Sequence, residues 1–190
     1  MVRRALCGIE PTGLHTHFKG LATTDPVELV EKIITRTVQF PDDELLIRSL
    51  TEQPSDSRRI LPYVLHEQER AFRKSRKADP ITSQEITIEH VMPKERGKSW
   101  PKVADAKDYD RLVGLIGNLV PLSGPQNKAA QNRPWDEKRE RFGGSNFQIT
   151  QALSSRESWL VADIRSRSKE IAEWSCARWP YPALIQKMLL

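Results

Sequence analysis

The chain has only two cysteines, Cys7 and Cys176, which lie near opposite ends of its 190 residues. Two cysteines without a C-x-x-C pair exclude a zinc site made of four thiolates. The sequence also lacks an apolar run of about 18 residues, which excludes a membrane-spanning helix, and it lacks the apolar core of a secretory signal peptide. We therefore expect a cytoplasmic protein that has no contact with a membrane and keeps its thiols reduced.

The amino-acid composition is that of an ordinary soluble globular protein, with 38% hydrophobic and 29% charged residues. Internal repeats and low-complexity tracts are absent from the sequence. A chain of this length fits one domain or slightly more, and it buries enough surface to fold without a disulfide or a structural zinc ion. The formal net charge is +5. Such an excess permits a polyanionic partner, but it fits a solvated surface equally well.

Hydrophobic periodicity and capping residues predict a mainly helical chain with two short strands. The strands are expected over the β-branched segment 86–91 and over 118–122. The order strand, strand, helix around these segments predicts a small ββα unit embedded in a mainly α fold. Helices are expected over residues 27–40, 43–50, 57–77, 105–115, 125–132, 135–142 and 156–177.

A carboxylate, an imidazole and an amide stand at places where they can meet. Glu89 and His90 end the first expected strand, and Asn127 lies in the first turn of the helix that follows the second. Hydrolysis of a phosphodiester needs a base to activate water and a cation to offset charge on the phosphate. His90 suits the base because the pKa of an unperturbed histidine lies near neutrality. Glu89 and Asn127 offer the hard oxygen ligands that Mg²⁺ prefers.

Two conditions apply to this set. Because neighbours along a strand point to opposite faces, Glu89 and His90 can share one site only if the strand ends or bulges there, and Pro93 favours such an end. Asn118 stands where the chain returns to the second strand. An asparagine side chain there can bond backbone groups on both sides, so we expect Asn118 to hold the strand–loop–strand geometry.

The ordered set resembles the HNH endonucleases, also called His-Me finger or ββα-metal nucleases. More narrowly, it resembles the C-terminal nuclease domain of GmrSD-type restriction proteins, over roughly residues 58–182. The residues that carry the resemblance are Ile88–Pro93, Trp100, Ile116–Ser123, Asn127, Lys128, Trp135, Lys138 and Phe142.

The resemblance implies a role for each site residue. His90 would be the catalytic base, Glu89 and Asn127 the ligands of Mg²⁺ or Mn²⁺, and Asn118 the structural asparagine of the catalytic finger. HNH enzymes often have aspartate where Glu89 stands. Asparagine in place of histidine at position 127 favours magnesium or manganese over zinc.

Contacts with nucleic acid are expected from the loop after the first strand and from the helices that follow the second. The candidates are Lys94, Lys98, Trp100, Lys128 and Lys138. An exposed tryptophan between lysines can stack on a base. Lys138 matches a lysine of the family and is either a phosphate contact or an ordinary surface lysine.

The resemblance also divides the chain. Residues 58–190 would form the HNH nuclease domain with flanking helices, and residues 1–57 a helical segment or linker. Val2–Gly8 is similar to the hinge that joins this domain to an upstream nucleotide-binding sensor domain in the family. The function implied is a metal-dependent DNA endonuclease in bacterial modification-dependent restriction or phage defence. Two alternatives stay open: a basic helical DNA-binding module with a vestigial finger, and a helical partner-docking domain.

Overall fold

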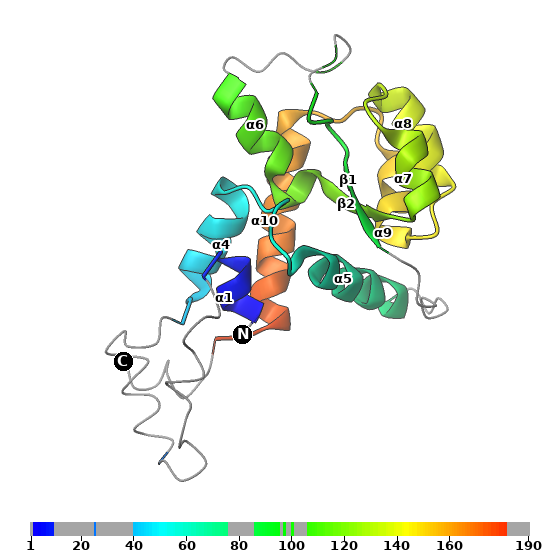
Figure 1. The fold of residues 1–190 in the computed structure, drawn as a ribbon. Helices are drawn as coiled ribbons and strands as arrows, with labels where there is room; N and C mark the ends of the chain where they lie inside the picture. The colour runs from blue at the N-terminus through cyan, green and yellow to red at the C-terminus, as the bar shows by residue number, and fades with distance from the viewer. Residues whose placement is uncertain are drawn as a thin grey trace.

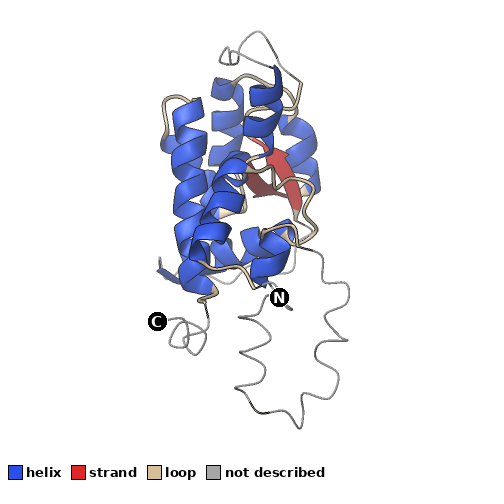
Figure 2. Ribbon diagram, turned by 90° about the vertical axis from the view of Figure 1, so that its left-hand side faces the viewer, coloured by secondary structure: helices blue, strands red, loops and turns tan. Residues whose placement is uncertain are grey.

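The computed structural model describes residues 2–9, 25, 40–75, 86–95, 97, 100 and 106–181. These residues are mostly helical and include a two-stranded antiparallel sheet, which the helices surround (Figures 1 and 2). None of the described helices is both long enough and apolar enough to cross a membrane. The elements are α1 (Val2–Leu6), α4 (Asp43–Glu52), α5 (Leu61–Ser75), β1 (Thr87–His90), α6 (Ala106–Gly114), η2 (Ile116–Asn118), β2 (Leu119–Leu122), α7 (Gly124–Ala130), α8 (Trp135–Gly143), α9 (Gln148–Gln151), η3 (Ala152–Ser155) and α10 (Val161–Arg178).

The expected mainly helical class and both expected strands are confirmed. Two helices begin later than expected. α5 begins at Leu61 because turns occupy residues 56–57 and 59–60, and Pro62 then stands in the first turn of the helix, where proline is tolerated. α10 begins at Val161 because Oδ2 of Asp163 accepts the backbone N–H of Leu160 at 2.8 Å. The short helices α9 and η3 were not expected, and the helix expected over 27–40 lies outside the described residues, apart from Phe40.

The sheet pairs Glu89 of β1 with Val120 of β2 and His90 with Leu119. β2 is buried along its whole length, whereas β1 buries Glu89 and leaves its other residues half-buried. The chain enters α7 one residue after β2, and α7 packs against β1. β1 therefore has β2 along one edge and α7 beside it.

Two apolar clusters hold these elements together. The first joins the loop after β1 to α6, β2, α8 and the start of α10. The second joins α1, α4 and α5 to η2 and the second half of α10. Residues on both sides of position 57, such as Leu50 and Leu65, share the second cluster. The boundary expected after residue 57 stays a prediction.

Helix α10 crosses the middle of the molecule and holds the turn that leads into β2 (Figure 1). The approach is so close that a Cβ on Gly117 would lie 2.0 Å from the carbonyl oxygen of Ile164. Arg167 is buried and donates from Nη1 to the carbonyls of Gly117 at 2.7 Å and Leu119 at 2.8 Å. Burial lowers the pKa of Arg167 to about 10, so the guanidinium stays charged at neutral pH. The guanidinium of Arg167 therefore joins α10 to the start of β2 through charge-assisted hydrogen bonds.

Candidate active site

Glu89 forms a buried ion pair with Lys138 of α8. Nζ of Lys138 lies 2.5 Å from Oε1 of Glu89 and 2.6 Å from the carbonyl oxygen of His90. Lys138 is fully buried and Glu89 is 6% exposed. Burial raises the pKa of Glu89 and lowers that of Lys138, and the ion pair opposes both shifts. The backbone of His90 also hydrogen-bonds to the Glu89 carboxylate, so this side chain has two partners.

Asn127 is held against β1 in one orientation. Its Nδ2 donates to Oγ1 of Thr87 at 2.9 Å and to the carbonyl oxygen of Ile88 at 3.1 Å. The hydroxyl proton of Thr87 is committed to the carbonyl of Leu122 at 2.8 Å. Oγ1 of Thr87 must therefore accept from Asn127, which fixes the amide nitrogen toward β1 and leaves Oδ1 without a partner among the described residues.

His90 is the last residue of β1, and the chain bends at Val91 and Met92. Glu89 and His90 both keep a partner in the ladder, Val120 and Leu119 respectively, so the strand ends after the pair and not between the two residues. Their side chains therefore leave opposite faces of β1. The imidazole side chain is 17% exposed, and its Nε2 lies 3.5 Å from Oδ2 of Asp56. Burial and the charge of Lys94 lower the pKa of His90 to about 4 against the opposing charge of Asp56. The ring is therefore neutral at pH 7, but its affinity for a proton is lower than that of the unperturbed histidine expected from the sequence.

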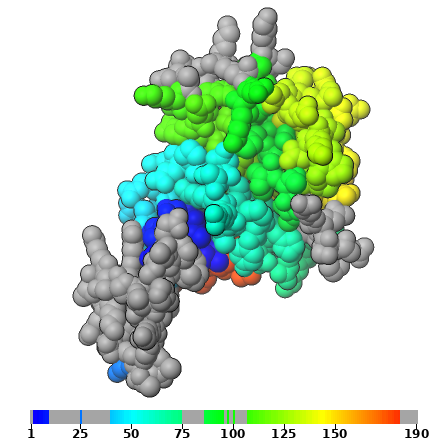
Figure 3. Space-filling model, in the orientation of Figure 1, coloured from blue at the N-terminus to red at the C-terminus, as the bar shows by residue number. Residues whose placement is uncertain are grey.

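Asp56 was missed in the sequence, where it gives no signal beyond that of an acidic turn residue. It stands between α4 and α5, 34 positions before His90, and its Oδ2 also accepts from Nζ of Lys94 at 2.8 Å. Burial acts to raise its pKa, but Lys94 and His90 together lower it. The green segment that contains β1 reaches the surface beside the cyan segment that contains residues 43–60 (Figure 3).

Asn118 is fully buried, and its side chain bonds the segment after β1, the end of α6 and the residue Trp159 before α10. Nδ2 donates to the carbonyls of Met92 at 2.8 Å and Val113 at 2.9 Å. Oδ1 accepts the backbone N–H of Met92 at 2.7 Å and the indole N–H of Trp159 at 3.2 Å. The expected bonding to backbone groups on both sides is confirmed. Asn118 therefore contributes to the site by fixing the bend after His90.

Two of the expected nucleic-acid contacts need correction. Trp100 is 4% exposed, and its Nε1–H donates to the carbonyl of Arg133 at 3.2 Å. The loop folds this ring into the apolar core, so the ring offers no face for a base to stack on. Lys138 is not available to contact a phosphate, because its buried ammonium is hydrogen-bonded to Glu89 and to the carbonyl of His90.

The other candidates remain at the surface or lie outside the described residues. Lys94 is exposed and pairs with Asp56 beside His90. Lys128 is exposed on α7, one residue after Asn127. Lys98 lies outside the described residues. Lys94 and Lys128 thus stay predictions as phosphate contacts, on elements that adjoin the site.

The donors around β1 fit a hard divalent cation. In the part of the chain that the structure describes, no three His, Cys, Asp or Glu side chains gather closely enough to hold a metal ion. Glu89 and Asn127 would offer one carboxylate oxygen and one amide oxygen. Such a set matches Mg²⁺, which keeps several waters and takes only one or two protein ligands.

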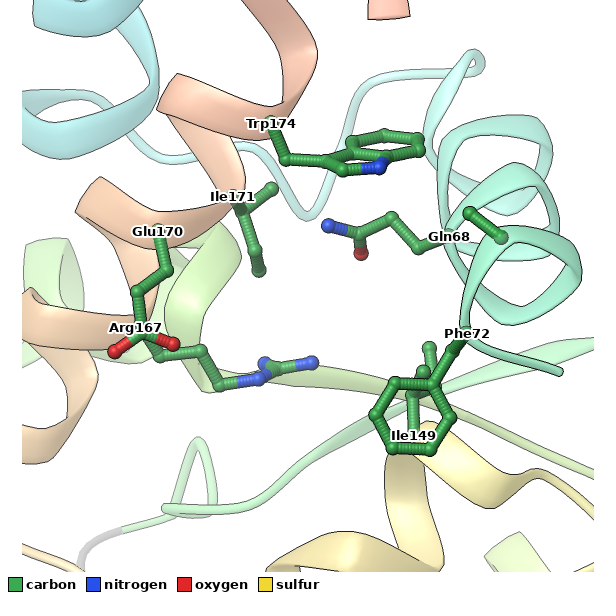
Figure 4. Close-up of a pocket in the computed structure, with 8 residues that line it drawn as sticks. Gln68, Phe72, Ile149, Arg167, Glu170, Ile171 and Trp174 are labelled. Atoms are coloured by element: carbon green, nitrogen blue, oxygen red, sulfur yellow. The ribbon is translucent and has the colours of Figure 1, made fainter. Parts of the chain in front are cut away.

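A cavity of about 440 Å³ lies between α5, α9 and α10, away from this site (Figure 4). None of its lining residues is an expected site residue. The side chains of Gln68, Phe72, Arg167 and Trp174 face it. Its lining includes a carboxylate, Glu170, but none of the lining residues is a histidine.

The family of the chain follows from a match that includes every element of the site. The family model of the C-terminal domain of GmrSD restriction endonucleases matches residues 40–174. No curated protein and no solved structure is similar enough to the chain to count as a match. The matched segment covers Asp56, both strands, α7 and α8. The chain belongs to the GmrSD restriction endonuclease family and carries its C-terminal, nuclease-type domain.

Proposed function

We propose that this domain is a metal-dependent DNA endonuclease of the HNH type, acting in modification-dependent restriction or phage defence in the bacterial cytoplasm. The observation that carries the proposal is a neutral, half-buried His90 at the end of β1, directly after Glu89. Asn127 is held against the same strand with Oδ1 left to accept. In this proposal the base and the two oxygen ligands come from one short strand and the helix beside it.

The proposed reaction assigns one task to each residue. The neutral ring of His90 takes a proton from a water molecule, whose oxygen forms a bond to phosphorus while the bond from phosphorus to the 3′ oxygen breaks. The leaving 3′ oxygen takes a proton from solvent. Glu89 and Asn127 would hold Mg²⁺ or Mn²⁺, which supplies positive charge to the phosphate and the leaving oxygen when bound. Lys94 and Lys128 bind the backbone without reading bases.

The partners of the domain complete the proposal. Its substrate would be phage or modified DNA. Because the proposed backbone contacts carry no sequence information, the choice of substrate would come from an upstream nucleotide-binding sensor domain. These partners are inferred from the resemblance to GmrSD-type proteins.

A nicking assay tests the nuclease. We expect the chain to convert supercoiled plasmid to nicked or linear DNA in Mg²⁺ or Mn²⁺, and EDTA to stop the reaction. His90→Ala should lower the rate by about 10²- to 10⁴-fold, the usual contribution of a general base. His66→Ala on α5 is the matched control and should keep the activity. Binding of DNA without nicking in any of the metals tested would refute the nuclease function.

One observation favours a second function, a DNA-binding module whose finger is not catalytic. The ammonium of Lys138 already neutralises Glu89, so charge balance at Glu89 does not require a metal ion. In that case Glu89→Gln and Asn127→Ala would leave DNA binding unchanged, with no metal-dependent nicking in the parent chain. Loss of nicking in both variants, with binding retained, would exclude this function.

A further inference from the structure

We propose that Asp56, in the turn between α4 and α5, is the positioning residue of His90: its carboxylate accepts the Nε2 proton of the imidazole and leaves Nδ1 to take the proton from water. The inference rests on the proposed nuclease function, in which His90 is the base. It concerns a residue that lies 34 positions before the histidine and outside the set that carries the resemblance.

The first step is the state of Nε2. This nitrogen is buried and makes no hydrogen bond within the described part of the chain. Buried polar atoms nearly always have a partner. The carboxylate oxygen that lies 3.5 Å away, Oδ2 of Asp56, is an acceptor at the outer limit of hydrogen bonding. A small rotation of either side chain closes this gap, as catalytic hydrogen bonds tighten when substrate binds.

The second step is the choice of tautomer. A neutral imidazole carries one proton, on Nδ1 or on Nε2. A carboxylate only accepts, so Asp56 favours the proton on Nε2, the nitrogen that it faces. Nδ1 is then the nitrogen with a lone pair for a proton from water. In serine proteases a buried aspartate holds a histidine in one tautomer in the same way.

The third step is the rigidity of the turn that carries Asp56. The backbone N–H of Ser55 donates to the carbonyl of Gly114 at 2.6 Å, at the end of α6. A Cβ on Gly114 would lie 2.7 Å from Cβ of Pro54 and 3.2 Å from Oδ1 of Asp56, so the turn lies directly against α6. On its other side, Arg58 donates to the carbonyl of Leu6. A turn held from both sides can position a carboxylate.

The fourth step concerns Lys94, which shares Oδ2 of Asp56 with His90. Its side chain is 63% exposed, whereas that of Asp56 is 18% exposed. A lysine this exposed can turn toward a phosphate, which would leave Oδ2 to His90. The loss of Lys94 should therefore appear in the KM for DNA, and the loss of Asp56 in kcat.

The tautomer of His90 is the direct test. Long-range ¹⁵N–¹H NMR spectra of the full chain with labelled histidine distinguish a protonated ring nitrogen from an unprotonated one. The chain has four histidines, and His90→Gln identifies the signals of His90. At pH 7.5 we expect the proton on Nε2, and a mixture or a reversal in Asp56→Asn. A proton on Nδ1 in the parent chain, or an unchanged spectrum in Asp56→Asn, would overturn the proposal.

Nicking kinetics give the second test. Asp56→Asn should lower kcat by about 10- to 100-fold, the usual cost of removing a residue that orients a catalytic ligand, with the KM for DNA within about twofold. Asp56→Glu keeps a carboxylate and should recover part of the loss. Asp108→Asn, an equal change at an exposed ion pair on α6, should keep the parent kcat.

The two tests separate this inference from the function on which it rests. If His90→Ala abolishes nicking and Asp56→Asn keeps the parent kcat, the nuclease function stands and the role of Asp56 is refuted. If no metal supports nicking by the parent chain, the nuclease fails, and the NMR spectra still decide whether Asp56 sets the tautomer of His90. A matching fall in thermal stability for Asp56→Asn and Asp56→Glu, without recovery of kcat, would also refute a positioning role.

Discussion

Lys138 and Glu89 lie 2.5 Å apart, Nζ to Oε1, and both side chains are buried. Loss of one partner of a buried ion pair leaves the other charge uncompensated, which costs about 3–5 kcal/mol. Lys138→Met should therefore lower the free energy of unfolding by about that amount in EDTA. Mg²⁺ should restore part of it if a cation binds at Glu89. Urea unfolding with and without Mg²⁺ measures both effects.

Two further variants control this prediction. The pair Lys138→Met and Glu89→Gln removes both charges, so it should cost less than Lys138→Met alone. Lys169→Met removes an exposed lysine whose Nζ lies 3.8 Å from Glu173, and it should change stability by less than about 1 kcal/mol. Equal losses for Lys138→Met and Lys169→Met would contradict a buried, paired Lys138.

The contact of Gly117 with α10 predicts a steep cost for any side chain there. A Cβ at this position would lie 2.0 Å from the carbonyl oxygen of Ile164 and 2.6 Å from the backbone nitrogen of Ser168. Gly117→Ala should therefore lose at least about 3 kcal/mol, at the upper end of overpacking costs. Gly124→Ala is the matched control, because a Cβ there would have no described atom within 4 Å other than those of its chain neighbours and its own helix backbone. Thermal unfolding of both variants measures the difference in stability. Equal stability of the two variants would contradict the close contact between Gly117 and α10.

The two ion pairs of Glu67 predict how the free energy of unfolding depends on pH. Its buried carboxylate accepts from Arg70 at 2.8 Å and from Arg178 at 2.6 Å. Burial acts to raise the pKa of Glu67, but the two arginines lower it below its ordinary value of 4.5. The stabilisation is therefore present above pH 4.5 and is lost as the pH falls through the folded-state pKa. Glu67→Gln should be less stable than the parent chain at pH 7, with a difference that shrinks toward pH 3 in urea unfolding.

Lys128 and Trp100 should differ in their effect on DNA binding. Lys128 is exposed on α7, whereas Trp100 is buried. Removal of one phosphate contact lowers the slope of log K against log salt by about 0.9. We expect Lys128→Gln to show this change and Trp100→Phe to keep the parent slope, while Trp100→Phe loses about 1 kcal/mol of stability with its hydrogen bond to Arg133. A reduced slope in Trp100→Phe would contradict its place in the core.

Local patterns were sufficient to predict the sheet and the bonding of Asn118 to backbone groups. β-Branched alternation set β1, and Pro93 set its end. The hydrogen bonding of Asn118 was predictable because the short amide side chain of an asparagine often bonds nearby backbone groups. The structure shows all four of its hydrogen bonds. These features depend on neighbouring residues, which a sequence displays.

Contacts between residues far apart in the chain explain the features that the sequence did not predict. Lys138 was expected near a phosphate, but the pairing of α8 with β1 buries it on Glu89. Asp56 reaches His90 through tertiary contacts of its turn, with Gly114 on one side and with Leu6 through Arg58 on the other. Segment 148–155 forms α9 and η3, which are each four residues long, too short for a periodic pattern to indicate them.

The bond of Arg167 to the carbonyls of Gly117 and Leu119 has a consequence for how the protein opens. A sheet of two four-residue strands is marginal by itself in water. Because a buried charge on α10 and the amide of Asn118 bind its turns, the sheet can separate only when α10 leaves. The amide protons of β2 should thus exchange with solvent as slowly as those in the middle of α10, through global unfolding. The strand pairing that carries His90 is then among the last parts of the molecule to open, whereas the exposed side chains of Lys94 and Lys128 lie at the surface beside it.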